Sequence, residues 1–173
     1  MFIRIASTAF LFNLNKILLI KRSINKKVAP GLWSGIGGHA EPFELNNPLA
    51  TCFREVYEET GIEENDIKDL NLRYIILRKC ESENEIRLSY IFFGNTNCID
   101  VKDTSEGELF WIDKEKVLDL KMSGTIHAVI KHYIEEGYLN SEIFVGVMSE
   151  SESGIMNWTV LGDYEKSKLV TIP

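Results

Sequence analysis

Three glutamates, Glu55, Glu58 and Glu59, stand three and four residues apart within the segment from Asn47 to Gly61. At about 100° per residue, these spacings place the three side chains together on one face of a helix. Such close carboxylates repel one another, so basic side chains, bulk water or a divalent cation must compensate for them. A hard cation such as Mg²⁺ takes oxygen ligands and is usually completed by substrate phosphates. A solvated acidic surface is the alternative, and the three acids alone do not decide between the two.

The segment that carries these acids has the start and stop signals of a helix. Asn47 is a good N-cap residue, Pro48 suits the first turn, and Gly61 suits the left-handed end. The apolar side chains of the segment fall on the stripe opposite the acids. The pattern therefore predicts a helix over 47–61 that buries one face and presents the glutamates on the other.

Residues on both sides of the acids extend the pattern. Gly38 is followed six positions later by Glu44, and the segment ends in Arg54-Glu55-Val56-Tyr57-Glu58-Glu59-Thr60-Gly61-Ile62. Over positions 38–62 this resembles the Nudix box, the hydrolase signature G-x5-E-x7-R-E-U-x-E-E-x-G-U, in which U is aliphatic. Its R-E-x-x-E-E-x-G part is expected by chance only about 10⁻⁴ times in a chain of this length, so the resemblance is specific.

One departure from the family pattern lies between Glu44 and Arg54. Nine residues separate them here, where the family has seven. Because Pro48 keeps its usual place, the two extra residues lie in Leu45-Asn46-Asn47, before the helix begins. In the family, the matching arginine anchors the box by pairing with a carboxylate, and the matching glutamate supports that arginine or the metal cluster. We therefore expect Glu44 to reach the site from a longer loop.

The resemblance implies hydrolysis of a nucleoside diphosphate linked to another group, with Mg²⁺ or Mn²⁺ as the cofactor. It assigns Glu55, Glu58 and Glu59 to the metal, with the backbone carbonyl of Gly38 as a further ligand. Glu55 and Glu106 are the two candidates for the acid that orients or deprotonates the attacking water.

Four more residues are candidates for contact with the substrate, and each has a structural alternative. Trp33 and Trp111 can stack on a base, although tryptophans beside strands more often pack in the core. Arg22 ends a predicted strand and faces either a phosphate or solvent. His39 follows the glycine pair and is expected to line the pocket.

The elements that must position these residues follow from the apolar periodicity. Beyond the helix over 47–61, we expect a loop over the glycine-dense stretch 31–38 and a helix over 126–136 that Gly137 closes. Together with the resemblance, which covers roughly residues 1–136, this predicts one α/β domain over 1–173, a Nudix-type α/β/α sandwich around a mixed β-sheet. The remaining elements are expected as strands over 3–12, 16–21, 73–79, 87–94 and 109–112, a helix over 114–120 and a hairpin over about 141–162.

Length and charge limit the classes of partner. A chain of 173 residues suits a single domain. Its net charge of −7, without a basic tract, argues against a nucleic-acid polymer or an anionic membrane as a partner. The three cysteines show no CxxC spacing and fit reduced thiols, so we expect a soluble, cytoplasmic protein.

The family resemblance leaves the small-molecule nucleotide substrate open. A nucleoside triphosphate is the first expectation, with an oxidised purine as the variant that the loop around Trp33 favours, as in MutT-like members. ADP-ribose or a nucleotide sugar is the alternative, and a non-catalytic nucleotide-sensing module is the rival from another class. The hairpin near the end of the chain is a specificity segment, a lid or a contact in a homodimer.

Overall fold

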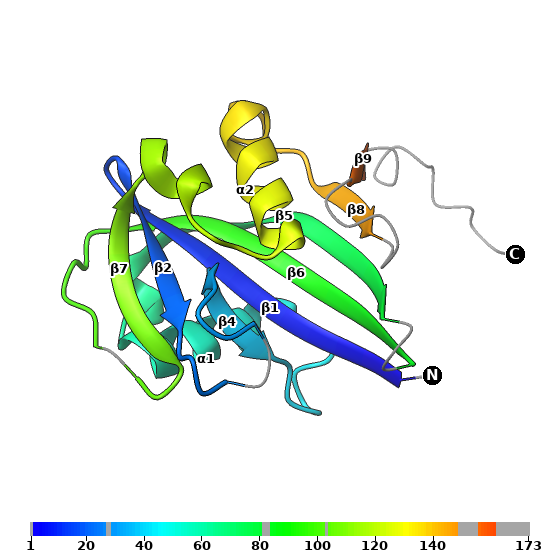
Figure 1. Cartoon of the computed structure of the whole chain (residues 1–173), viewed down its shortest axis with the longest axis horizontal. Coiled ribbons are helices and arrows are strands. Elements are labelled where there is room, and N and C mark those ends of the chain that lie inside the picture. The colour runs from blue at the N-terminus through cyan, green and yellow to red at the C-terminus, as the bar shows by residue number, and fades with distance from the viewer. Residues whose placement is uncertain (1, 27–28, 81–83, 103, 149–155, 162–173) are drawn as a thin grey trace, which may run out of the picture.

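The computed structural model describes residues 2–26, 29–80, 84–102, 104–148 and 156–161 (Figure 1). Within them, nine strands form one sheet in the order β3-β2-β1-β6-β5-β8-β9, with β4 also pairing with β1 and β7 with β2. The strands are β1 (Phe2–Asn13), β2 (Lys16–Arg22), β3 (Trp33–Ser34), β4 (Ile36–His39), β5 (Ile67–Cys80), β6 (Glu85–Thr96), β7 (Gly107–Asp113), β8 (Phe144–Met148) and β9 (Asn157–Val160).

The sheet is mixed. β1 and β6 run parallel at its centre, in a register that pairs Phe2 with Glu85 and Phe12 with Asn95. β5 is antiparallel to β6 and parallel to β8, and β8 is antiparallel to β9. The last pairing lies where the sequence predicts a hairpin, whose connecting residues 149–155 lie outside the described part of the chain.

Helix α1 (Pro48–Thr60) begins and ends as its sequence predicts. The Asn47 side chain accepts a hydrogen bond from the backbone N–H of Ala50 at 3.2 Å, which satisfies a donor at the helix start. Gly61 ends the helix with a φ of 77°, and its N–H donates to the carbonyl of Tyr57.

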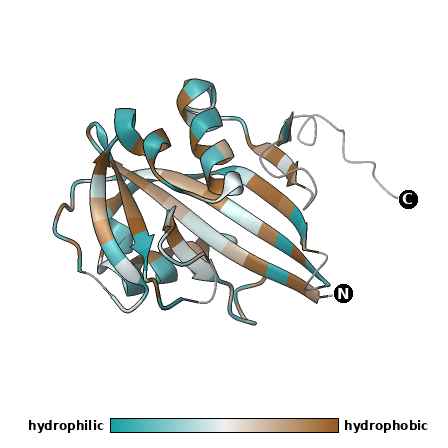
Figure 2. Ribbon diagram, viewed as in Figure 1, coloured by the Kyte–Doolittle hydropathy of each residue, from teal (hydrophilic) through white to brown (hydrophobic). Residues whose placement is uncertain are grey.

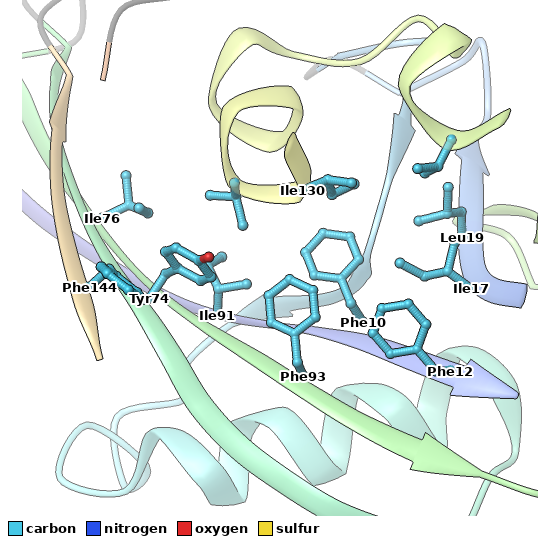
Figure 3. Close-up of a cluster of buried hydrophobic side chains, with 12 residues drawn as sticks. Phe10, Phe12, Ile17, Leu19, Tyr74, Ile76, Ile91, Phe93, Ile130 and Phe144 are labelled. Atoms are coloured by element: carbon cyan, nitrogen blue, oxygen red, sulfur yellow. The ribbon is translucent and has the colours of Figure 1, made fainter. Parts of the chain in front are cut away.

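Each face of the sheet carries its own hydrophobic core. Alternate residues of β1 point to opposite faces, so Phe10 and Phe12 join one core and Ala9 and Leu11 the other. Helix α2 (Gly124–Glu135) covers the first core, as the close-up with Phe10 and Phe93 shows (Figure 3), and α1 covers the second. Two helices on opposite faces of a mixed sheet confirm the predicted α/β/α sandwich.

Three details differ from the sequence prediction. The segment expected as a helix over 114–120 is a 3₁₀ helix, Lys114–Asp119. Gly137 does not cap α2, whose C-cap is Glu136; it packs instead against Tyr74, where a Cβ would lie 2.4 Å from the hydroxyl oxygen. The glycine-dense stretch expected as a loop contains β3 and β4. In the described residues, no helix combines the length and apolarity that a membrane crossing requires.

Candidate active site

A cavity of about 770 Å³ opens where β4 and α1 meet the central strands. Its lining unites most of the residues that the sequence singles out. β4 contributes Gly38 and His39, and the end of β2 contributes Arg22. Glu106 comes from the loop before β7. The contribution of α1 is Arg54, Glu55, Glu58 and Glu59.

Arg54 bonds to acids on both of its sides. On one side its Nε and Nη2 donate to the two carboxylate oxygens of Glu44, at 2.8 and 2.9 Å. On the other side its Nη1 donates to Glu55 at 2.8 Å and to Glu58 at 3.0 Å. Nη2 also donates to the carbonyl of His39 at 2.9 Å, which ties α1 to β4. This is the role of an anchor within the box.

Glu44 lies buried behind Arg54, with 5% of its side chain exposed, and does not line the cavity. Its carboxylate also accepts hydrogen bonds from the Glu41 backbone N–H and the Thr51 hydroxyl. The hydrogen bonds from Arg54 dominate in lowering the pKa of Glu44 to about 2. The loop with two extra residues therefore still delivers this carboxylate to the arginine.

The three helix acids sit in different environments. Glu59 is buried and accepts a hydrogen bond from the Gly37 N–H at 3.0 Å, and its burial raises its pKa to about 7. Burial also raises the pKa of Glu55, against the opposing effect of Arg54. Glu58 is the exposed member, with 56% of its side chain accessible.

Gly38 gives Glu55 the room it needs. A Cβ at this position would lie 2.5 Å from the carboxylate atoms of Glu55. Only a glycine therefore lets the backbone of β4 approach the helix acids this closely. Gly38 itself is among the residues that line the cavity.

The donor set fits a hard divalent cation. Three carboxylates and a backbone carbonyl are the oxygen ligands that such ions take, and a cation would offset the burial of Glu55 and Glu59. Among the described residues, however, no His, Cys, Asp and Glu side chains form a ready group of three or more around one point. The three helix acids bond to other partners instead. Arg54 donates to Glu55 and Glu58, and the Gly37 N–H donates to Glu59.

Glu106 and Arg22 reach the cavity from the loop before β7 and from the end of β2. Glu106 forms an ion pair with Lys26 at 2.6 Å. The backbone N–H of Ser23, the residue after Arg22, donates to the carbonyl of Glu106, so the end of β2 and this loop are held together.

The two tryptophans are not among the residues that line the cavity, and their contact with the substrate stays a prediction. Trp33 packs against the core under α2, with its ring 5.2 Å from that of Phe110. Trp111 packs against the core on the α1 side and donates its indole N–H to the carbonyl of Ile99. Both side chains pack against a hydrophobic core, which is the structural alternative that the large apolar area of an indole favours.

Arg4 and Arg87 line the cavity and were not singled out from the sequence. Both stand in strands, where an isolated arginine reads as a surface residue. The signal that could have found them is positional, since each is the third residue of a strand that later contains an apolar run.

Comparisons with known proteins agree with this geometry. The model of the NUDIX domain family matches residues 2–133. A comparison with curated proteins finds no match. The structure is similar to that of a MutT protein from Bacillus halodurans, with 21% identity and a TM-score of 0.71 over 92% of this chain and 98% of that one. A MutT protein from Methanosarcina mazei Go1 is 24% identical, with a TM-score of 0.65 over 78% of this chain and 95% of that one.

A third similar structure is that of an Ap4A hydrolase from C. elegans, which is 14% identical with a TM-score of 0.57, over 78% of this chain and 96% of that one. These likenesses concern the fold, whereas the family match spans most of the chain. The chain therefore belongs to the NUDIX domain family, as a Nudix hydrolase that retains the acids of the box. Nudix hydrolases generally use divalent metal cations.

Proposed function

We propose that this protein hydrolyses a phosphoanhydride bond of a nucleoside diphosphate linked to another group, with Mg²⁺ or Mn²⁺ as the cofactor. The observation that carries the proposal is the gathering of Glu55, Glu58, Glu59 and Gly38 along one wall of a cavity of about 770 Å³. That volume suits a nucleotide-sized ligand.

The residues of the box divide the work. Glu55, Glu58, Glu59 and the Gly38 carbonyl would hold the cation, which when bound neutralises charge that develops on the phosphate oxygens. Arg54, fixed by Glu44, keeps the helix acids aligned with β4. In this scheme Arg22, which also lines the cavity, contacts a phosphate oxygen of the substrate.

Glu55 is our assignment for the group that orients the attacking water and accepts its proton. It lies beside Gly38 in the cavity, and burial raises its pKa toward the range in which a carboxylate serves as a base. Glu106 is the second candidate, but Lys26 already occupies one of its oxygens.

The first substrate to test is a nucleoside triphosphate. An oxidised purine triphosphate stays a variant of this substrate, although Trp33 packs against the core and is not among the residues that line the cavity. ADP-ribose and nucleotide sugars remain the alternatives, and the fold does not choose among them, because similar structures include both MutT proteins and an Ap4A hydrolase. The free thiols of Cys52, Cys80 and Cys98 support a cytoplasmic setting for this activity.

The test is product release from a panel of nucleoside triphosphates, oxidised purine triphosphates, nucleotide sugars and ADP-ribose, with Mg²⁺ and with chelator. We expect turnover that requires the metal and falls by about a hundredfold or more in Glu58→Gln. Glu63→Gln, which removes an exposed acid just beyond α1, is the matched control and should retain activity. Nucleotide binding without turnover of any substrate would favour the nucleotide-sensing module instead.

A further inference from the structure

Three arginines stand side by side across the centre of the sheet. The register pairs Arg4 of β1 with Arg87 of β6, and Arg87 in turn with Arg78 of β5. These strands are neighbours in Figure 1. In each strand, residues two apart share a face, so this arginine row, Arg4–Arg87–Arg78, lies on the same face as Phe10. That face is the one α2 covers further along the strands.

The row marks the end of the apolar surface. In Figure 2 the hydrophobic colour of β5 and β6 gives way to hydrophilic colour near their ends beside the N-terminus. Like charges directly opposite each other on neighbouring strands are destabilising. A row of three guanidiniums therefore costs stability unless anions compensate for it.

Glu85 supplies one compensating charge. Its carboxylate, 5% exposed, accepts a hydrogen bond from the Nε of Arg4 at 2.8 Å and one from the Nε of Arg87 at 2.6 Å. This single negative charge contacts two guanidiniums and fixes both by their Nε atoms. The two side chains are thereby held in place before any ligand arrives.

Arg78 supplies an independent observation. Its Nε is buried, yet it donates no hydrogen bond to any partner in the described structure. A buried N–H of a charged group left without an acceptor is costly, so such groups are rare and call for an acceptor. Arg78 is not among the residues that line the cavity, so an anion on the arginine row would meet this Nε only after the side chain moves.

The row adjoins the site already described. Arg4 and Arg87 line the same cavity as Glu55, Glu58 and Glu59, and Ser89 and Thr8 add hydroxyl groups to the wall beside them. Arg78 stands next to Arg87, one strand further from β1. A molecule whose diphosphate meets the acids of α1 can thus extend its other end toward the arginines.

We propose that the arginine row binds a phosphate group at the end of the substrate remote from the bond that is cleaved. This inference rests on the proposed function, and it names the substrate class: a nucleoside diphosphate derivative that carries an additional phosphate monoester. Guanidiniums bind phosphate by paired, charge-assisted hydrogen bonds, which suits a row of them better than it suits a neutral base or sugar.

The test compares binding of AMP with that of adenosine 2′,5′-bisphosphate and 3′,5′-bisphosphate by calorimetry, with Mg²⁺ and with chelator. None of these probes contains an anhydride, so affinity is measured without turnover. We expect one bisphosphate to bind at least about tenfold more tightly than AMP. In Arg4→Gln and Arg78→Gln this advantage should fall to within about threefold. Arg78→Lys, which keeps the charge, should restore part of it.

Lys131→Gln is the matched control, because it removes one positive charge from the exposed face of α2 and should leave the preference intact. Thermal unfolding of each variant shows whether it folds, and the comparison of ligands in the parent protein does not depend on any variant. Equal affinity for AMP and both bisphosphates, or no binding of any of them, would overturn the inference. So would a preference that survives Arg4→Gln and Arg78→Gln. Phosphate-dependent binding without turnover of any nucleoside diphosphate derivative, including derivatives that carry an additional phosphate monoester, would instead contradict the proposed activity alone.

Discussion

Arg54 has two sets of hydrogen-bond partners, one on each side of its guanidinium. Glu44 holds its Nε and Nη2 from behind, whereas Glu55 and Glu58 share its Nη1 on the side of the cavity. A cation arriving at the helix acids competes for the second set of contacts and leaves the first set in place. Arg54 can therefore lose its hydrogen bond to Glu58 when a metal binds and still be held in place by Glu44.

Replacing Glu44 by glutamine tests this support. The pKa of Glu44 is about 2 in the folded protein, against an ordinary value of 4.5, so its ionised form favours folding above about pH 4.5. That contribution is lost progressively as the pH falls toward 2. We expect Glu44→Gln to destabilise the protein by about 2 kcal/mol at pH 7, because Arg54 loses a charged partner.

Thermal unfolding between pH 7 and pH 3 measures the effect. The difference between parent and Glu44→Gln should shrink as the pH falls, since protonation removes the same charge from the parent. Glu63→Gln, an exposed site, controls for the loss of one carboxylate. A difference that stays constant across this range would show that the carboxylate of Glu44 is not the source of the stability.

For individual residues, the sequence predicts a group that lies within one segment better than a group that strand pairing brings together. The spacing of Glu55, Glu58 and Glu59 on one helix is visible in the sequence. The neighbours Arg4 and Glu85 are 81 residues apart, and only the register of β1 and β6 brings them together. The tryptophans were ambiguous because an indole serves equally in a core and against a base.

Among the elements, α1 owes its ends to two residues outside the chemistry, Asn47 and Gly61. Gly61 has a φ of 77°, and no other group lies within 4 Å of where its Cβ would be. Gly38 presents the opposite case, because its Cβ would meet the carboxylate of Glu55. Gly61 is thus needed for its backbone conformation, whereas Gly38 is needed for the close approach of β4 to Glu55.

Substituting alanine at each glycine distinguishes the two effects. Gly61→Ala should lower the free energy of unfolding by about 1 kcal/mol, the cost of a left-handed alanine, and leave the catalytic rate nearly unchanged. Gly38→Ala should displace Glu55 and reduce the rate by at least about tenfold. Denaturant unfolding and steady-state kinetics on both variants provide the measurement. Equal rates in the two variants would argue against the placement of Glu55 beside Gly38.

The longer elements were predicted from sequence, whereas the two short strands of the glycine-dense stretch, β3 and β4, were not. Apolar alternation identifies β1, β2, β5 and β6, although β5 and β6 extend several residues beyond the predicted limits. β4 was not predicted, because its glycines produce no alternation of apolar and polar residues. Its pairing depends on those glycines, since a Cβ at Gly37 would lie 2.1 Å from the carbonyl oxygen of Ser7 on β1.

For the whole molecule, the charge of the site differs from that of the chain. The protein carries a net charge of −7, yet arginines from three strands, Arg4, Arg22 and Arg87, line the cavity together with the acids of α1. Charges of both signs in the lining of one cavity suit a ligand complex in which a cation and phosphates bind together.

Metal binding should therefore be measurable as stability of the whole fold. A cation that binds the folded protein alone, at about one hundred times its dissociation constant, stabilises by about 2.7 kcal/mol and raises the unfolding temperature by about 5 °C. We expect this increase with Mg²⁺, its reversal by chelator, and a smaller increase in Glu58→Gln and Glu59→Gln. Glu63→Gln should behave as the parent does. The same unfolding temperature with Mg²⁺ and with chelator would count against a metal site in the box.

The parallel pairing of β1 with β6 also bears on how the molecule is made. β1 leaves the ribosome well before β6, which is needed to complete its central ladder. Closing so long a loop is entropically costly and slows folding, whereas α1 closes over neighbouring residues. During synthesis one edge of β1, the strand that carries Phe10 and Phe12, stays unpaired until β6 is made. An unpaired edge can form non-native strand pairings. The strand at the centre of the finished sheet thus depends on a partner strand that is made later in the chain.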